Sequence, residues 1–202
     1  MMKIISCEIF KPYIELLNME LDIVYLDIEG HNYPKRLARM IQKEIDQSLN
    51  YEKILVLYGL CGNALLDLKV RDIPIYVIRV HDCLSILLGS KERFYHLFNE
   101  RLSCGWSCYS LENRVISYDG YDEEEVEYLK SVLDLKKDVY VSFSLEKEKE
   151  YEKKYTEIIT GNLQFLKSII SLESTELLQV TQNDILKFDE REIVRKDKKW
   201  IN

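Results

Sequence analysis

Residues 53–58, Lys-Ile-Leu-Val-Leu-Tyr, decide the fold class of this chain. After the lysine the run is apolar without alternation, which is typical of a strand buried on both faces, as in a parallel sheet. Glycine follows it at Gly59, so the run has the length of a strand and falls well short of the roughly 20 residues that cross a bilayer. The stretch therefore predicts a central strand of a parallel sheet.

Strand-like and helix-like segments alternate on both sides of this strand. Lys3–Cys7 and Leu21–Ile28 are predicted strands, and Tyr33–Leu49 is a predicted helix because its apolar residues recur with a period of about 3.6. Ile73–Arg79 is another near-continuous apolar strand, and a helix is predicted over Ser90–Glu100. This alternation implies right-handed crossovers and an α/β fold, namely a Rossmann-like three-layer sandwich with a mostly parallel central sheet.

The second half of the chain carries weaker patterns. Asp122 with Glu125 predicts a capping box at the start of a helix, and Gly161 predicts the end of a long charged helix. The other elements that we expect there are a strand over Asp138–Phe143, a charged helix over Leu145–Ile159, a helix over Leu163–Ile170 and a strand near Glu176–Val180. At 202 residues the whole chain fits a single domain, with a strand–helix core in residues 1–101 and C-terminal strands and helices in residues 102–202.

Composition and charge limit the partners that this protein can have. The net charge of -7 disfavours contact with phosphate backbones, so we expect no nucleic-acid partner. The apolar runs are too short for a membrane span or a signal peptide, which predicts a cytoplasmic protein that does not associate with membranes. Five cysteines, an odd number, fit reduced or metal-bound thiols better than a disulfide framework. The expected partners are a small molecule or another protein, and the sequence leaves open whether the chain forms a homo-oligomer.

Reactive side chains follow four predicted strands at their carboxyl ends. Cys7 ends the first strand, His31 follows the second, Cys61 follows the third, and His81 and Cys83 follow the fourth. In a parallel sheet these ends meet at one edge, where open α/β sheets bind ligands. Thiolate and imidazole ligands select zinc, iron or copper(I) over magnesium or calcium. The sequence therefore predicts a metal site, with zinc as the first choice, ligated by Cys61, Cys83 and His81 and completed by Cys7 or His31.

Neighbouring residues could orient these ligands or contact a substrate. The candidates for that role are Tyr58, Asn63, Arg79, Asp82, Ser90 and Trp106. Ordinary structural roles compete with several assignments, because Ser90 is well explained as a helix cap and the glycines around Cys61 as a tight turn. Cys104 and Cys108 are best explained as two independent packing cysteines. The spacing includes no Cys-x-x-Cys pair, and His81 and Cys83 need a loop to share one metal, because successive strand residues point to opposite faces.

Other functions stay open beside metal binding. One is a metal-free cysteine enzyme, in which Cys61 or Cys83 pairs with His81 or His31, and another is a redox pair of the same two cysteines. A third is a binding module that delivers a corrinoid or a metal to a partner enzyme, and a fourth is an α/β domain with inert thiols. Whether the protein is an enzyme is left open. If it is, a zinc-bound water or a substrate thiol is the reactive species that we expect.

The Cys and His motifs resemble an uncharacterised bacterial and archaeal family, the domain of unknown function 1638 (DUF1638). The likeness covers most of the chain and rests on Cys7, on His31 with Pro34 and Leu37, and on the motifs at residues 58–63, 79–83, 88–90, 105–106 and 161–163. Residues 102–104 depart from the family pattern, and a late Gly-Pro-like turn is missing. Members often lie near corrinoid-dependent methyl-transfer systems of anaerobes. The resemblance therefore implies a role linked to a metal or to methyl transfer, with iron or a corrinoid as alternatives to zinc.

Overall fold

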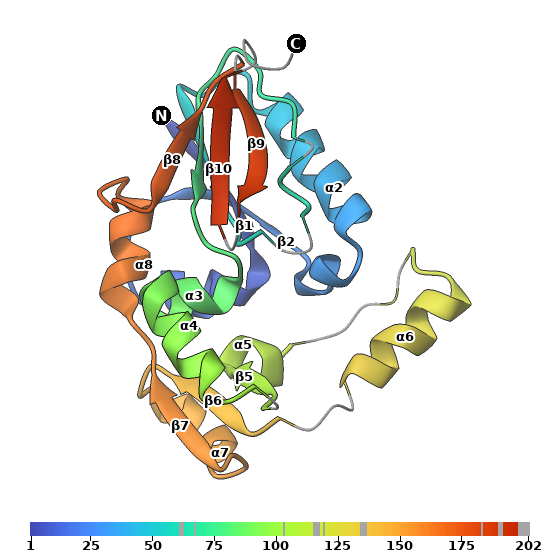
Figure 1. Ribbon diagram of the computed structural model, residues 1–202, viewed down its shortest axis with the longest axis vertical. Coiled ribbons are helices and arrows are strands. Elements are labelled where there is room, and N and C mark those ends of the chain that lie inside the picture. Colours follow the sequence, from blue (N-terminus) through green and yellow to red (C-terminus); the bar gives the residue numbers. More distant parts are fainter. Residues whose placement is uncertain are drawn as a thin grey trace.

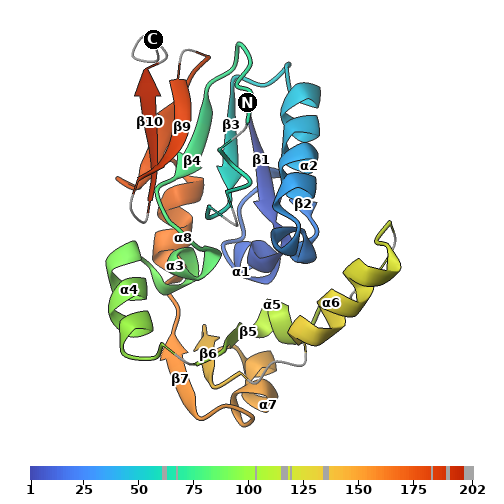
Figure 2. The same ribbon diagram turned by 45° about the vertical axis from the view of Figure 1, so that its right-hand side comes forward.

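The computed structural model describes residues 1–60, 63–66, 68–102, 104–114, 118, 120–133, 137–182, 184–189 and 192–197. Its main feature is a five-stranded sheet in the order β2-β1-β3-β4-β8 (Figures 1 and 2). Four of these strands are parallel, and β8 pairs antiparallel with β4. Their bounds are β1 Met2–Cys7, β2 Asp22–Leu26, β3 Lys53–Leu57, β4 Ile75–Ile78 and β8 Leu177–Val180. The predicted α/β class with a mostly parallel sheet is confirmed.

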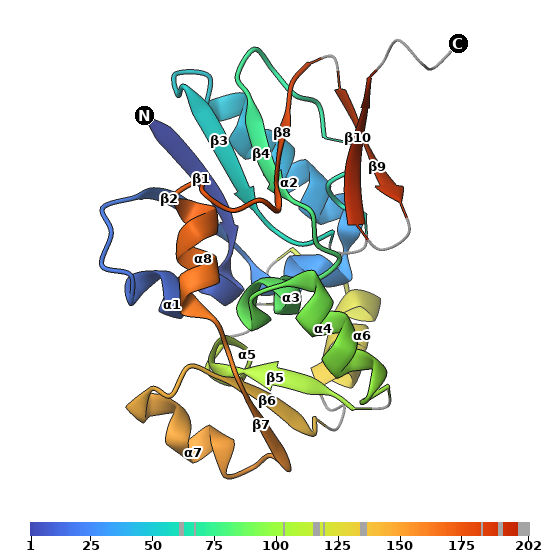
Figure 3. The ribbon, with the colours of Figure 1, turned by 60° about the vertical axis from the view of Figure 1, so that its left-hand side comes forward.

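Helices cover both faces of this sheet. Figure 3 shows α8 on one face and α2 on the other. In α2 the buried residues are Leu37, Ile41 and Ile45, so one stripe of the helix packs on the sheet as the periodicity predicts. The helical segments around the sheet are η1 Glu8–Phe10, α1 Lys11–Glu15, η2 Ile28–Asn32, α2 Pro34–Gln47, α3 Cys83–Leu88, α4 Lys91–Asn99 and α8 Leu163–Ile170.

A second parallel sheet, of three strands in the order β5-β6-β7, lies between α4 and α8 in the chain. Its strands are β5 Trp106–Cys108, β6 Val139–Ser142 and β7 Glu157–Thr160. The helical segments that join them are α5 Tyr109–Glu112, α6 Glu123–Leu133, η3 Glu146–Glu148 and α7 Lys149–Glu152. A hairpin of β9 (Asp184–Asp189) and β10 (Glu192–Asp197) follows β8.

The predicted charged helix over Leu145–Ile159 is wrong. Helical structure ends at Glu152, and Glu157–Thr160 pairs with β6 as the strand β7. Gly161 therefore follows a strand instead of a helix. The next residue, Asn162, begins α8, because its side-chain oxygen accepts a hydrogen bond of 2.9 Å from the Phe165 amide.

The carboxyl edges of the two sheets face each other (Figures 1 and 3). The chain leaves β1 through η1 and α1 and leaves β5 through α5, and α5 contacts both η1 and α1. Ser110 in α5 donates a hydrogen bond of 2.6 Å to the Ile9 carbonyl, and the Tyr13 and Phe143 rings lie 4.2 Å apart between centroids. The edges at which α/β sheets bind ligands therefore open toward the same region of the molecule.

None of the helices in the described ranges combines the length and apolar composition that crossing a membrane requires.

Candidate functional site

Two predicted metal ligands, Cys7 and Cys83, lie together at the carboxyl edge of the large sheet. Cys7 is the last residue of β1 and Cys83 is the first residue of α3, and they are 4% and 8% exposed. Because β1 and β4 flank β3, the two side chains meet beyond the end of β3, where their thiols are hydrogen-bonded to one another. This hydrogen bond and burial raise the pKa of the Cys7 thiol well above its usual value, since two adjacent buried thiols resist ionisation.

Gly59 allows the loop after β3 to approach this thiol pair. A Cβ at Gly59 would lie 2.8 Å from the Cys83 amide nitrogen, so any side chain there would push the two loops apart. The Gly59 amide instead donates to the Cys83 Sγ at 3.4 Å, and the Leu60 amide donates to the His81 carbonyl at 3.0 Å. The segment that leads to Cys61 is thus tied to the segment that carries Cys83, although Cys61 itself lies outside the described residues.

The two predicted histidine ligands also follow strands of the large sheet. His81 lies between β4 and α3 and is exposed. For His31 only the backbone is described, and it lies in η2, after β2. Over the described ranges, no group of three or more His, Cys, Asp or Glu side chains is arranged to hold a metal ion. Among the predicted ligands whose side chains are described, Cys7 and Cys83 lie in contact with one another.

Two of the predicted orienting residues act as helix caps. Asp82 accepts a hydrogen bond of 2.7 Å from the Leu84 amide at the start of α3. Ser90 accepts one of 3.0 Å from the Arg93 amide at the start of α4, as the alternative interpretation of this serine predicts. The cap formed by Asp82 fixes the first turn of α3 and with it the position of Cys83.

The other predicted orienting residues are spread over the molecule. Tyr58 is buried directly after β3, and Arg79 lies beside Glu176, with 3.8 Å between its Nε and the carboxylate. Asn63 is exposed and has a left-handed backbone, with φ of 72°. Trp106 begins β5 and therefore belongs to the small sheet.

A further group of buried titratable side chains lies at the carboxyl edge of the small sheet. Cys108 ends β5, Glu148 lies in η3 after β6, and Tyr13 reaches them from α1; all three side chains are fully buried. Burial raises the pKa values of all three groups, and the nearby Cys108 thiol adds to the rise at Tyr13. One Glu148 carboxylate oxygen accepts hydrogen bonds of 2.9 Å from the amides of Phe143 and Leu145.

The other Glu148 oxygen, Oε1, has no hydrogen-bond partner among the described residues. The charged sequence around Glu148 indicates a solvated helix, and Tyr13 comes from α1, which follows a strand of the large sheet, so no sequence pattern reveals this group.

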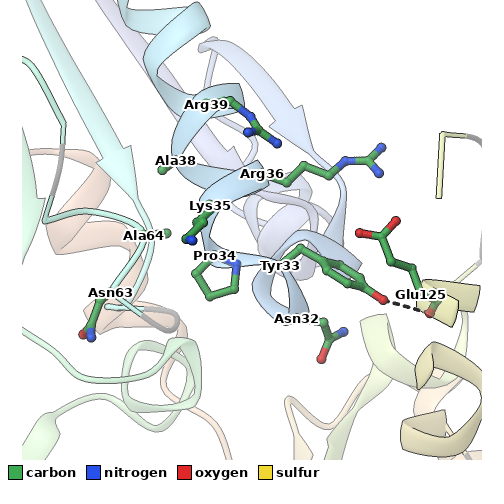
Figure 4. A pocket seen from close by; sticks show the side chains of 10 residues that line it. All are labelled: Asn32, Tyr33, Pro34, Lys35, Arg36, Ala38, Arg39, Asn63, Ala64 and Glu125. Atoms are coloured by element: carbon green, nitrogen blue, oxygen red, sulfur yellow. Dashed lines mark hydrogen bonds between the residues drawn. The ribbon is translucent and has the colours of Figure 1, made fainter. Parts of the chain in front are cut away.

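A pocket of about 600 Å³ lies beside the first turns of α2 (Figure 4). Its lining residues are Asn32, Tyr33, Pro34, Lys35, Arg36, Ala38, Arg39, Asn63, Ala64 and Glu125. A smaller pocket of about 320 Å³ lies between the sheets and includes Glu8, directly after Cys7, and Tyr109, directly after Cys108.

Comparison with known proteins adds a family but no function. Residues 25–161 match the family model described as "Protein of unknown function (DUF1638)", which is more than half of the chain. No curated protein and no solved structure matches the chain.

Proposed function

Because the chain belongs to the DUF1638 family, whose function is unknown, we propose its function from its own residues: it binds a soft divalent metal ion, zinc first, at the carboxyl edge of the large sheet. The proposed ligands are Cys7, Cys83 and Cys61, with His81 or His31 as the fourth. The observation that carries the proposal is the contact between the two buried thiols of Cys7 and Cys83.

The raised pKa of Cys7 favours a metal over a free nucleophile. Reactive cysteines have lowered pKa values and lie in electropositive, partly exposed surroundings, whereas Cys7 is buried beside a second thiol. A divalent cation removes this obstacle, because it holds both sulfurs as thiolates and offsets their repulsion. These surroundings therefore favour metal binding by the pair over a role as a free thiolate nucleophile.

The loop contacts support Cys61 as the next ligand. The hydrogen bonds from Gly59 and Leu60 tie the loop before Cys61 to the segment of Cys83, and thiolates are preferred zinc ligands. Four protein ligands would close a structural site, whereas three would leave a position for water or a substrate thiol. A role in corrinoid-dependent methyl transfer is a proposal that rests on the family resemblance alone.

The same contact favours one second candidate, a redox-active dithiol. Two adjacent thiols can form a disulfide when an oxidant such as a small disulfide accepts their two electrons and two protons. Cys7 and Cys83 would form this disulfide, and both are in the reduced thiol form in the structure.

Metal analysis of protein purified under anaerobic conditions, without a metal-affinity tag, tests the proposal. We expect close to one equivalent of zinc or iron in the parent and loss of that metal in Cys7→Ser, Cys61→Ser and Cys83→Ser. Cys104→Ser is the matched control, because this half-buried cysteine precedes the small sheet and should leave the metal content unchanged.

A parent without metal, or variants that keep it, would contradict metal binding. Thiol counting after denaturation then examines the redox candidate: mild oxidation should remove two of the five thiols in the parent and none in Cys7→Ser.

A further inference from the structure

The pocket beside α2 is positively charged, although the protein as a whole is acidic. Three of its lining side chains, Lys35, Arg36 and Arg39, are cationic, and one, Glu125, is anionic. Lys35 and Arg39 are exposed, and neither makes a hydrogen bond or ion pair with another residue in the described ranges. Figure 4 shows Lys35 between α2 and the loop that carries Asn63.

Arg36 is held in place as part of the pocket wall. Its guanidinium donates a hydrogen bond of 2.9 Å to the Gly120 carbonyl and lies 4.0 Å from the centroid of the Tyr121 ring. Tyr33 is fixed as well, because its hydroxyl donates a hydrogen bond of 2.8 Å to the Glu125 carbonyl. Lys35 and Arg39, which have no partner within the described ranges, therefore border a pocket whose walls are held by hydrogen bonds.

The positions of these cations reduce the stability of the helix that carries them. Lys35 and Arg39 are four residues apart on α2, where like charges repel each other. Lys35 and Arg36 also lie in the first turn, where the helix dipole favours anions, and that turn has no acidic residue. Local conflicts of this kind are found where a residue serves function more than stability, and an anion between the side chains would relieve both repulsions.

The pocket has the position and size of a ligand site. It borders the start of α2, which follows β2, and Asn63, which follows β3, so it lies toward the carboxyl edge of the large sheet. Its volume of about 600 Å³ is in the range of small-molecule sites, and Tyr33, Pro34 and Ala64 supply apolar surface. The exposed Asn63 adds an amide that can donate hydrogen bonds from the opposite side.

We propose that this pocket binds a small organic dianion, a phosphate monoester or a dicarboxylate, with its charged group between Lys35 and Arg39 and its body against Tyr33 and Pro34. The site goes beyond the proposed metal binding and does not depend on it.

Isothermal titration calorimetry at constant ionic strength tests this site. The probes are phenyl phosphate and phthalate, and benzyl alcohol is the uncharged comparison. We expect the parent to bind at least one dianion and not the alcohol, and Lys35→Ala/Arg39→Ala to bind it at least about tenfold more weakly, since two charge-assisted hydrogen bonds are lost. Asn63→Asp places a negative charge on the opposite wall and should also weaken binding. Lys43→Ala, an exposed charge further along α2, is the matched control and should bind as the parent does.

Preference for phenyl phosphate identifies a phosphate monoester and preference for phthalate a dicarboxylate. A parent that binds neither dianion, a double variant that binds like the parent, or an equal loss in Lys43→Ala would overturn the proposal. Thermal melting of the double variant gives a second check, because removing the repulsion should leave it at least as stable as the parent. Metal content of the same samples separates this result from the metal proposal, because the double variant keeps every proposed ligand.

Discussion

Several residues at the sheet edges are buried although they carry ionisable groups, whose charged forms are normally stabilised by water. Cys7 and Cys83 share this property with Glu148, whose carboxylate is fully buried. The first pair could be predicted in part, because Cys7 ends one strand and Cys83 follows another, and parallel strands bring such positions together. The Glu148 group could not, because Tyr13 and Cys108 join it through contacts between two sheets that no local pattern encodes.

Glu148→Gln should change how stability depends on pH. Burial raises the pKa of Glu148 above its ordinary value of 4.5, so the folded state holds the proton more tightly than the unfolded state. The stability that this proton provides is complete below about pH 4.5 and is lost as the pH rises through the folded-state pKa. Glutamine stays neutral, so the stability of the variant relative to the parent, measured by urea unfolding, should rise as the pH increases from about 4.5 through the folded-state pKa of Glu148. Parallel pH profiles for the two proteins would contradict this.

At the scale of elements, predictions from short sequence patterns are confirmed where interactions between neighbouring residues determine the structure. The capping box is present, because Asp122 accepts a hydrogen bond of 2.9 Å from the Glu125 amide and the Glu125 carboxylate accepts one of 3.0 Å from the Asp122 amide. The helix over Leu163–Ile170 has the predicted bounds. The strand β7 was missed because the charges before it pair in a helical pattern, as Lys149 does with Glu146 at 2.5 Å. Its pairing with β6 is a non-local interaction that overrides that pattern.

Asn162→Ala should weaken the start of α8. The substitution removes the side-chain oxygen that accepts a hydrogen bond from the Phe165 amide, and loss of such a cap costs roughly 0.5–2 kcal/mol of the free energy of unfolding. Gln164→Ala, an exposed change in the same first turn, is the control and should stay within about 0.5 kcal/mol of the parent. Chemical denaturation measures both, and equal stability of the two variants would show that this cap is not needed.

At the scale of the whole molecule, the two sheets form many contacts at their facing edges. Besides the contacts of Tyr13 and Ser110, an ion pair joins Arg114, after α5, to Glu29 in η2, with 2.7 Å between Nε and the carboxylate. Their side chains are 12% and 4% exposed, so separating the sheets would leave a buried carboxylate without its cation. The sequence predicts a single domain, and these contacts favour that prediction, which unfolding can test.

Cooperative unfolding is the expected result. In a Trp200→Phe background, Trp106 is the remaining tryptophan and reports on the small sheet. Its fluorescence and the far-ultraviolet circular dichroism, to which the whole chain contributes, should change at the same urea concentration. Two separate midpoints would show that the sheets unfold independently and that the chain has two domains.

The small sheet lies within the sequence of the large one. The chain leaves the large sheet through α3 and α4 and returns at α8, where the Asn162 amide donates a hydrogen bond of 2.7 Å to the Leu87 carbonyl in α3. The exit and the return are therefore adjacent in space, as they are for a module inserted into a host fold. Bridging the two points would close only a short loop, which costs little chain entropy. A shortened chain, in which a few residues replace the small sheet and its helices, would therefore show whether the large sheet and its paired thiols can form alone.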